Sequence, residues 1–450
     1  RDTHEFLNKY KDVDLVIYDE IHNLIGRGEK ATLRRRMANL VSAISKSRIG
    51  LSATPYWKDA NDLKELADII RPLAMGQDFD SMLEQQQKIT AACNVLRREE
   101  IDINRWNRVK DELNIDDTTL ANRCDNALKM EADDRRKLSE ELASKGPFST
   151  WITRTRMEET GHQVVRQVPP ANLIELDDSE GEEGFDVKRN EIVRTRSEKE
   201  LIRDLQRVIR WPHTLELSSC PSAFHERIPT LLEKGFIVAG QENEARRIAA
   251  QLRLSGLSSK EKALVKVIRE LKDGGRKGTI IFTHWVQSTF NRLSRPGWLE
   301  NQIEGVKVYL LDPNVKEEEE YTAMKEKFLA HDDEELFPIL IATDKGSEGI
   351  DLQTVDSMIH YDLPKNPQKV EQRIGRIDRL KQESDNVEIR YILLKDFADH
   401  QHLVGMARQI RDFEENVGAM RPVTPDMSSY EMQFGAMDPG AQETLNRWNT

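Results

Sequence analysis

The sequence has few cysteines, few aromatic residues and no long apolar run. Its only cysteines, Cys93, Cys124 and Cys220, are too scattered for a disulfide framework or a zinc site, so we expect a reducing, cytoplasmic location. No apolar run reaches the roughly 18 residues of a membrane-spanning helix, so we expect no membrane role. Aromatic residues make up 6% of the chain, which argues against a single-strand binder built on base stacking.

Charged residues, by contrast, make up 32% of the 450 residues. The 79 acidic residues outnumber the 67 Lys and Arg, and the net charge of −12 excludes a uniformly basic nucleic-acid coat but not a local basic patch. At roughly 150 residues per domain, the length predicts about three domains. The chain begins with Arg1 rather than Met and has no targeting segment, so we interpret it as a piece of a longer or processed polypeptide.

Alternating strand-like and helix-like patterns predict an α/β fold with parallel sheets. The apolar run VDLVIY at 13–18 is typical of a strand buried on both faces, and a helical stretch and a second strand near 49–52 follow it. Further strand-like segments, separated mostly by helical patterns, begin at residues 279, 306, 337, 357 and 387. We place a first α/β lobe at 1–75, an all-α insertion at 76–148, the end of the first lobe at 149–176, a linker with helices at 177–257, a second lobe at 258–418 and an irregular tail at 419–450.

Two polar motifs follow the strands of the first lobe. DEIH at 19–22 comes directly after VDLVIY, and ligands of open α/β sheets gather at the carboxyl ends of strands. Asp19 could hold Mg²⁺, and Glu20 could activate a water that attacks a γ-phosphate. An acidic pair is also common in a chain this acidic, and SATP at 52–55 taken alone would suit an ordinary turn.

The second lobe contains the segment QRIGRIDR at 372–379. Asn-Pro at 366–367 is typical of a helix start, and the spacing predicts that Gln372, Arg376 and Arg379 share one helix face. The nearly opposite face would pack on the sheet through the apolar residues Val370, Ile374 and Ile377. Two aligned guanidinium groups suit a triphosphate, and a solvated face with salt bridges is the alternative. A Gly-bearing turn, GSEG at 346–349, could approach a phosphate or be a plain turn.

In this order, DEIH, SATP, GSEG and QRIGRIDR resemble the motifs of superfamily-two helicases and translocases. The longer run DLPKNPQKVEQRIGRIDRLKQ, with IIFTHWVQ upstream, is similar to the Swi/Snf-type translocases of double-stranded DNA. The helical insertion followed by ITRTRMEETGHQVVRQVPP is most similar to the RapA-like branch. The resemblance covers about residues 10–415 and implies two RecA-like lobes, the first incomplete, that hydrolyse ATP with Mg²⁺ to move on double-stranded DNA.

The resemblance also implies roles for individual residues. Asp19 would anchor Mg²⁺, Glu20 would activate water, and Arg376 and Arg379 would be arginine fingers. Nucleotide binding and coupling would involve His22, Ser52, Thr54, Gly349, Asp351 and Gln372. Contacts to the DNA backbone would come from Thr283, Lys345 and Ser347. Asp351 departs from the Asn common in relatives, and its carboxylate near a triphosphate would need Mg²⁺ or an arginine to offset it.

The phosphate-binding loop of this family is missing from the sequence. No G-x-x-x-x-G-K-[ST] occurs, so this chain supplies no such Lys or Gly-rich loop for the β- and γ-phosphates. The loop could lie upstream in the same polypeptide, which the Arg1 start favours, or come from another polypeptide.

Two functions therefore stay open. The favoured one is an ATPase motor, and the alternative is a catalytically inactive helicase-like scaffold that binds protein or DNA partners. Intact DEIH and arginine motifs favour the motor. RapA-like motors act with RNA polymerase or within prokaryotic defence complexes, and the residues do not choose between these partners.

Overall fold

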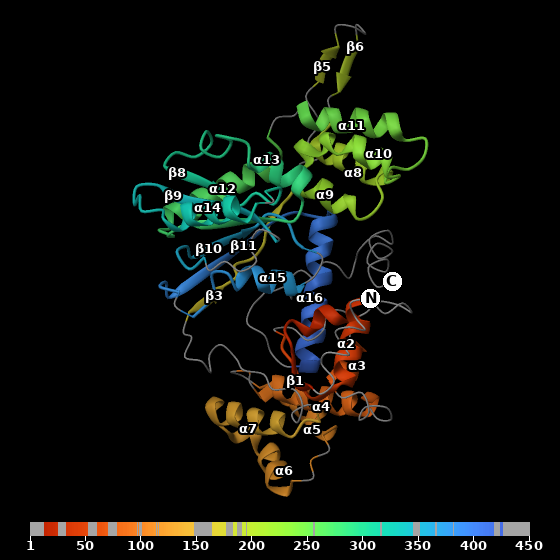
Figure 1. Ribbon diagram of the computed structural model, residues 1–450, viewed down its shortest axis with the longest axis vertical. Helices are drawn as coiled ribbons and strands as arrows, with labels where there is room; N and C mark the ends of the chain where they lie inside the picture. The colour runs from red at the N-terminus through yellow and green to blue at the C-terminus, as the bar shows by residue number, and fades with distance from the viewer. Residues whose placement is uncertain are drawn as a thin grey trace. The chain divides into compact units, whose positions relative to one another are not determined.

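The computed structural model divides into two compact units, which are described separately (Figure 1). The first unit comprises residues 1–156 and 408–421, and the second comprises 157–407 and 422–450. The structure describes residues 13–25, 33–52, 61–70, 79–96, 98, 101–113, 115, 117–147, 164–176, 183–186, 191–194, 196–254, 257–315, 317–344, 352–364, 367–380, 382–417 and 424–425. Over these ranges, no helix combines the length and apolar character that crossing a membrane requires.

The first unit contains two parallel strands, β1 (Val13–Tyr18) and β2 (Ser45–Gly50). Helix α2 (Leu33–Ala43) connects them, and α3 (Asn61–Ile70) and the short 3₁₀ helix η1 (Ile21–Leu24) complete a small core. Both predicted strands are present, the second four residues earlier than expected. Burial on both faces is not observed, because Leu15 and Ile17 remain 46% and 57% exposed in the described part of this unit.

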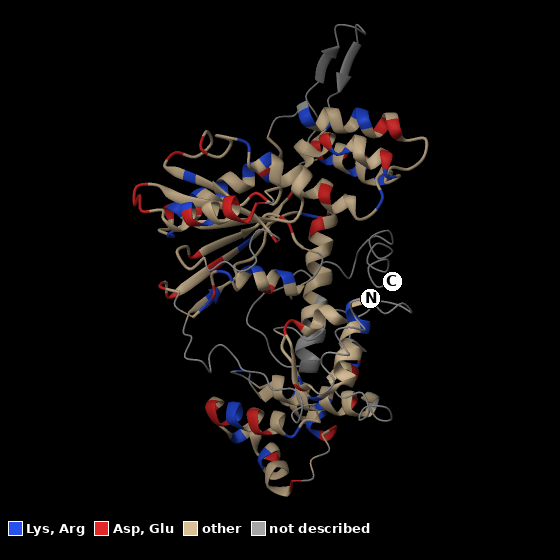
Figure 2. Cartoon of the chain, in the orientation of Figure 1, with Lys and Arg blue, Asp and Glu red and all other residues tan. Residues whose placement is uncertain are grey.

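The described part of the predicted insertion is helical, as expected. It consists of α4 (Phe79–Leu96), α5 (Ile103–Asp111), α6 (Thr118–Asp125), η2 (Ala127–Lys129) and α7 (Ala132–Ser144). Asp102 and Asp117 cap α5 and α6, because each carboxylate accepts hydrogen bonds from backbone N–H groups of the first turn. The helices enclose a core around Trp106, and their surfaces carry charges of both signs (Figure 2).

The second unit is built on a seven-stranded sheet in the order β3-β11-β10-β7-β9-β8, with β4 also paired to β11. Every pairing in it is parallel, which confirms the α/β class. The strands are β3 (Val165–Gln167), β4 (Asn172–Ile174), β7 (Thr279–Thr283), β8 (Val306–Leu310), β9 (Phe337–Thr343), β10 (Ser357–His360) and β11 (Asn386–Leu394). All five strands predicted for this lobe are present.

Strands β3 and β4 correct the predicted domain boundary. We assigned 149–176 to the end of the first lobe, but residues 165–174 extend the second sheet along β11. A short strand-forming stretch carries no local signal for the sheet it joins, because pairing depends on which strand edge is available in three dimensions.

The sheet of the second unit is accompanied by several helices. They are α12 (Ser259–Asp273), η5 (Val286–Phe290), α13 (Asn291–Leu293), α14 (Glu318–Leu329), α15 (Pro367–Ile374) and α16 (Ala398–Val417), which runs on into residues of the first unit. The Ser258 side chain caps α12, and Glu261 returns a hydrogen bond to the backbone N–H of Ser258, as the sequence predicted. Strands β7 and β9 are buried along their whole length, so the sheet forms the centre of this unit's core.

The region predicted as a linker contains a packed helical module. Its helices are α8 (Glu198–Val208), α9 (His213–Ser219), η4 (Pro221–Glu226), α10 (Ile228–Glu233) and α11 (Glu242–Leu254), preceded by a hairpin of β5 (Glu183–Asp186) and β6 (Glu191–Arg194). Their core includes Leu394 and Phe397 at the end of β11. Buried polar contacts also join the module to the sheet, since the Ser219 hydroxyl donates to Asp362 Oδ2 at 2.7 Å.

Candidate functional site

The parallel pairing of β1 and β2 brings the DEIH and SATP motifs to one edge of the sheet. Asp19 directly follows β1, and Ser52 lies two residues beyond β2. Backbone hydrogen bonds join the two strand ends, because Leu51 N donates to Tyr18 O at 2.8 Å and Ile21 N donates to Leu51 O at 2.9 Å. Carboxylates of one motif and the hydroxyl of the other therefore meet where α/β sheets bind ligands.

Glu20 has a left-handed backbone conformation, with φ of 48°. This conformation costs a residue with a Cβ atom about 1–2 kcal/mol, and such strain concentrates at functional sites. The Glu20 carboxylate lies 3.2 Å from His22 Nδ1, while its backbone N–H donates to Asp19 Oδ1 at 2.9 Å. The turn thus ties the Asp19 carboxylate to the backbone of Glu20 and the Glu20 carboxylate to His22.

His22 is buried and joins the two motifs. Its Nδ1 lies 2.8 Å from Ser52 Oγ, so the structure brings together two residues predicted to couple the nucleotide site. Burial lowers the pKa of His22 from 6.5 to about 4, although the nearby Asp19 charge opposes the change. The ring is therefore neutral at pH 7 and acts through hydrogen bonds. Thr54 lies outside the described residues.

Asp19 fits the donor chemistry of a magnesium site. Its carboxylate is exposed at the sheet edge, and Mg²⁺ keeps several waters while binding one or two carboxylates together with phosphate oxygens. Within the described ranges, no group of three or more His, Cys, Asp or Glu could hold a metal by itself. The residues present suit a metal that arrives with a nucleotide.

The arginine segment, defined here as residues 371–379, departs from the predicted single helix. Helix α15 starts at Pro367, as expected, but ends at Ile374, and Gly375 to Ile377 form turns. Gln372 lies on the helix, whereas the half-buried Arg376 and Arg379 lie beyond it, so the shared helix face was wrong. Gly375 explains the break, since glycine costs about 1 kcal/mol in a helix relative to alanine. The apolar residues of the prediction are fully buried: Val370, Ile374 and Ile377.

Arg373, to which the sequence analysis assigned no role, is buried within the arginine segment. Its side chain is 1% exposed, and its Nε lies 2.5 Å from Asp344 Oδ1, just after β9. Its Nη1 donates to Asp362 O at 2.9 Å, and the guanidinium lies 5.1 Å from the ring centroid of Phe282. The available signal was spacing, because Arg373 falls three residues after Val370 on the apolar face.

The ion pair with Arg373 changes the acidity of Asp344. Burial alone would raise the pKa of Asp344, but Arg373 and a hydrogen bond from His284 outweigh it and hold the pKa well below its usual range. The carboxylate therefore stays charged at neutral pH. The result is a fixed charge pair at the carboxyl end of β9.

Of the residues predicted to contact the nucleic-acid backbone, Thr283 alone lies within the described residues. Thr283 is fully buried, and its hydroxyl donates to Asp362 Oδ2 at 2.7 Å, which argues against a contact with a DNA backbone. Its position at the end of β7, a strand buried throughout, explains this burial. The remaining predicted residues lie outside the described ranges: Lys345, Ser347, Gly349 and Asp351.

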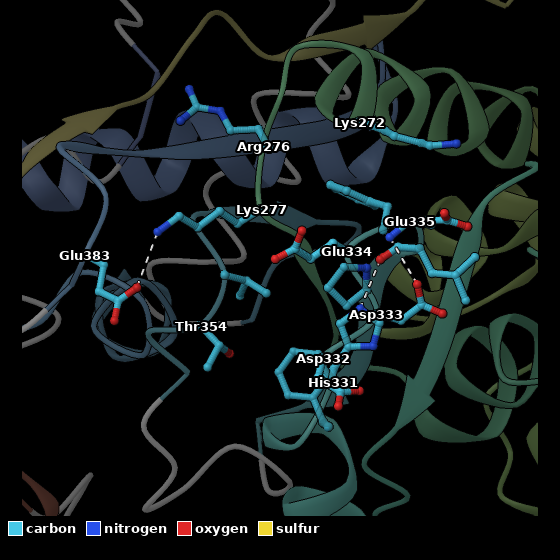
Figure 3. Close-up of a pocket in the computed structure, with 15 residues that line it drawn as sticks. Lys272, Arg276, Lys277, His331, Asp332, Asp333, Glu334, Glu335, Thr354 and Glu383 are labelled. Carbon is cyan, nitrogen blue, oxygen red and sulfur yellow. Dashed lines mark hydrogen bonds and ion pairs between the residues drawn. The ribbon is translucent and has the colours of Figure 1, made fainter.

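A hollow of about 790 Å³ lies at the opposite edge of the second sheet (Figure 3). Residues at the start of β9 and just before β10 line this hollow. Asp344 and Asp362, by contrast, follow the carboxyl ends of these strands. Its rim mixes charges of both signs, with Lys277 Nζ 3.5 Å from Glu383 Oε2. Ligands of parallel sheets gather at the carboxyl edge, so we assign no function to this hollow.

Comparison with known proteins identifies one part of the second unit. Residues 259–381 match the family model of the helicase conserved C-terminal domain. Over these residues the chain is similar to helicase C-terminal domains. The domain includes Arg373 and the predicted fingers Arg376 and Arg379, while β3, β11 and the helical module lie outside it.

Curated relatives agree with this helicase domain. The chain is 48% identical over 82 residues to an uncharacterized ATP-dependent helicase, YqhH, of Bacillus subtilis, and 30% identical over 121 residues to DEAD-box ATP-dependent RNA helicase 36 of Arabidopsis thaliana. It is 37% identical over 87 residues to the RNA polymerase-associated protein RapA of Vibrio campbellii. These matches cover 18%, 27% and 19% of this chain, and 14%, 23% and 8% of the three relatives. They confirm the resemblance to helicases and their RapA-like branch.

Proposed function

We propose that the protein is an ATPase motor that moves on double-stranded DNA. The observation that carries the proposal is the joined edge of the first unit, where Glu20 and Ser52 both contact the buried His22 and the Asp19 carboxylate accepts from the Glu20 backbone N–H. A helicase C-terminal domain on the same chain supplies the arginines that such a motor requires. In this proposal, both lobes contribute residues to ATP hydrolysis.

Each residue of the site has a definite task in this mechanism. Bound Mg²⁺ would neutralise phosphate charge, and Asp19 would hold it. Glu20 would orient a water and accept its proton, and its contact with His22 fixes the direction of the carboxylate. Arg376 and Arg379 would stabilise the charge that develops on the γ-phosphate.

Several finer assignments belong to the same proposal. We assign Thr54, Gly349, Asp351 and Gln372 to nucleotide binding and coupling, and Lys345 and Ser347 to the nucleic-acid backbone. The described cysteines are free thiols buried in the protein, which supports a cytoplasmic location. The RapA relatives are named for RNA polymerase association, which makes RNA polymerase, alongside a defence complex, a candidate partner.

The decisive experiment measures ATP hydrolysis by the full natural polypeptide with and without duplex DNA. Arg379→Ala should lower the turnover about 10³-fold, the scale of losing an arginine finger. Arg295→Ala is the matched control, because Arg295 pairs with Glu226 on the helical module and should leave turnover unchanged. Equal turnover of both variants would refute the finger assignment.

The nucleic acid is tested separately. Duplex DNA should stimulate hydrolysis more than duplex RNA, and its affinity should fall steeply with salt, because contacts to phosphates release counterions. Stronger stimulation by RNA would refute the DNA proposal, and a response that does not change with salt would refute backbone tracking.

The alternative, a catalytically inactive scaffold, follows from one observation. The sequence contains no G-x-x-x-x-G-K-[ST] to hold the β- and γ-phosphates. A full polypeptide that binds DNA or protein partners but hydrolyses no ATP would favour the scaffold over the motor.

A further inference from the structure

A buried arginine outside the helicase domain holds the arginine segment at two points. Arg166 lies on β3, and its side chain is 3% exposed. Its Nη1 and Nη2 donate to the two carboxylate oxygens of Glu371 at 2.7 and 3.0 Å. Its Nε donates to Asp378 Oδ2 at 2.8 Å, and the Asp378 side chain is fully buried. One guanidinium group thus binds two carboxylates of the same segment.

The two carboxylates bracket the residues proposed to act on ATP. Glu371 is on α15, directly before Gln372, and Asp378 directly precedes Arg379, with Arg376 between them. The regular helix ends at Ile374, and turn hydrogen bonds continue the backbone as far as Asp378, whose N–H donates to Ile374 O at 2.9 Å. Arg166 adds a side-chain contact to Asp378 in this second half of the segment.

Arg166 lies on a strand that is paired with the sheet of the second unit. Strand β3 pairs in parallel with β11, with Arg166 opposite Val387, and Val165 N donates to Asp385 O at 2.8 Å. Burial alone would lower the pKa of Arg166, but the carboxylates of Glu371 and Asp378 raise it, so the guanidinium group stays charged. A planar guanidinium presents its donors in a fixed arrangement, which a lysine cannot reproduce.

We propose that Arg166 is a positioning residue that sets the orientation of Arg376 and Arg379 through Glu371 and Asp378. The inference rests on the proposed ATPase function. It explains why a strand from outside the helicase domain reaches that domain's arginine segment with a buried charge. A buried ion pair adds little stability relative to apolar packing, whereas it fixes geometry well.

Arg276 provides the matched control. It lies on the same edge of the sheet, where it donates to Gln167 of β3 and to Glu388 of β11. Its carboxylate partner Glu388 is on a strand rather than on the arginine segment. Arg276→Met should therefore loosen the same pair of strands without moving Arg376 or Arg379.

The test compares steady-state ATP hydrolysis of Arg166→Met and Arg276→Met in the full natural polypeptide, at saturating duplex DNA. We expect Arg166→Met to lower kcat at least about 10-fold with KM for ATP changed less than about threefold, because misplaced fingers weaken transition-state contacts. Arg276→Met should keep kcat within about twofold of wild type. Arg166→Lys keeps the positive charge but loses the planar set of guanidinium donors, so it should also lower kcat.

Each other outcome counts against the inference. Equal kcat for Arg166→Met and Arg276→Met would overturn it while leaving the ATPase function intact. If Arg166→Met fails to fold, Asp378→Asn and Glu371→Gln replace it, and wild-type kcat in both would overturn the inference. A wild-type protein without ATPase activity would overturn the proposed function, and the inference with it, whereas an inactive Arg379→Ala beside an active Arg166→Met would overturn the inference alone.

Discussion

Replacing Arg373 with methionine tests the buried charge pair of the second unit. Methionine fills much of the same volume but carries no charge and donates no hydrogen bond. The substitution removes the 2.5 Å contact with Asp344, the 2.9 Å hydrogen bond to Asp362 O and the stacking on Phe282. It leaves the Asp344 carboxylate, whose side chain is 15% exposed, without its cation.

The expected cost is large because Asp344 is left charged inside the protein. Breaking a buried pair by removing one partner costs about 3–5 kcal/mol, more than the net value of the pair itself. His284 still donates to Asp344 and limits the loss, so we expect a value near the lower end, about 3 kcal/mol. Adding Asp344→Asn should recover part of this loss, because the second change removes the uncompensated charge.

Hydrogen exchange of the amides in β9 and β10 is the appropriate assay. It reports the free energy of opening this sheet independently of the first unit. The control is Arg295→Met, which removes a salt bridge to Glu226 with both side chains substantially exposed and should cost less than about 1 kcal/mol. A loss below about 1 kcal/mol for Arg373→Met, or no recovery in the double variant, would refute the assignment of a buried charge pair.

Two further predictions concern single residues. The pKa of His22 is about 4 in the folded protein and 6.5 without burial, so the unfolded state binds an extra proton between these values. The stability of the first unit should be complete above pH 6.5 and fall by about 1–3 kcal/mol toward pH 4, and His22→Gln should flatten this dependence in urea titrations; an unchanged slope would contradict it. Gly278→Ala would place a Cβ 2.6 Å from Val355 and 2.8 Å from Pro338, so it should cost about 1–3 kcal/mol by thermal unfolding, and a neutral effect would show that these neighbours can move.

The candidate site was predictable where its residues follow strands. Apolar runs such as FPILIAT have high strand propensity, and polar residues directly after them must lie at the carboxyl edge of a parallel sheet. This reasoning located Asp19, Glu20 and Ser52. It could not reveal that Glu20 adopts a left-handed conformation or that His22 is neutral, because both depend on burial against a second strand.

Thr283 and the arginine segment show what the sequence did not reveal. The resemblance to helicases implied a DNA contact for Thr283, but its side chain is buried and its hydroxyl donates to Asp362, which follows the adjacent strand β10. The spacing of Gln372, Arg376 and Arg379 fits one helix face, but the helix stops before the last two. In both cases a contact distant in sequence, or the cost of one glycine, decided the outcome.

The sequence by itself determined the strands β1, β2 and β7 to β11, the helical insertion, the capping box at Ser258 and the helicase motifs, because each depends on neighbours along the chain. Only the tertiary structure decided that β3 and β4 join the second sheet, that Arg373 is buried against Asp344, and that Arg166 holds both ends of the arginine segment. Arg166 is more than 200 residues from both of its partners. Ion pairs over such separations depend on which surfaces the folded chain brings together, and the local sequence does not specify which surfaces these are.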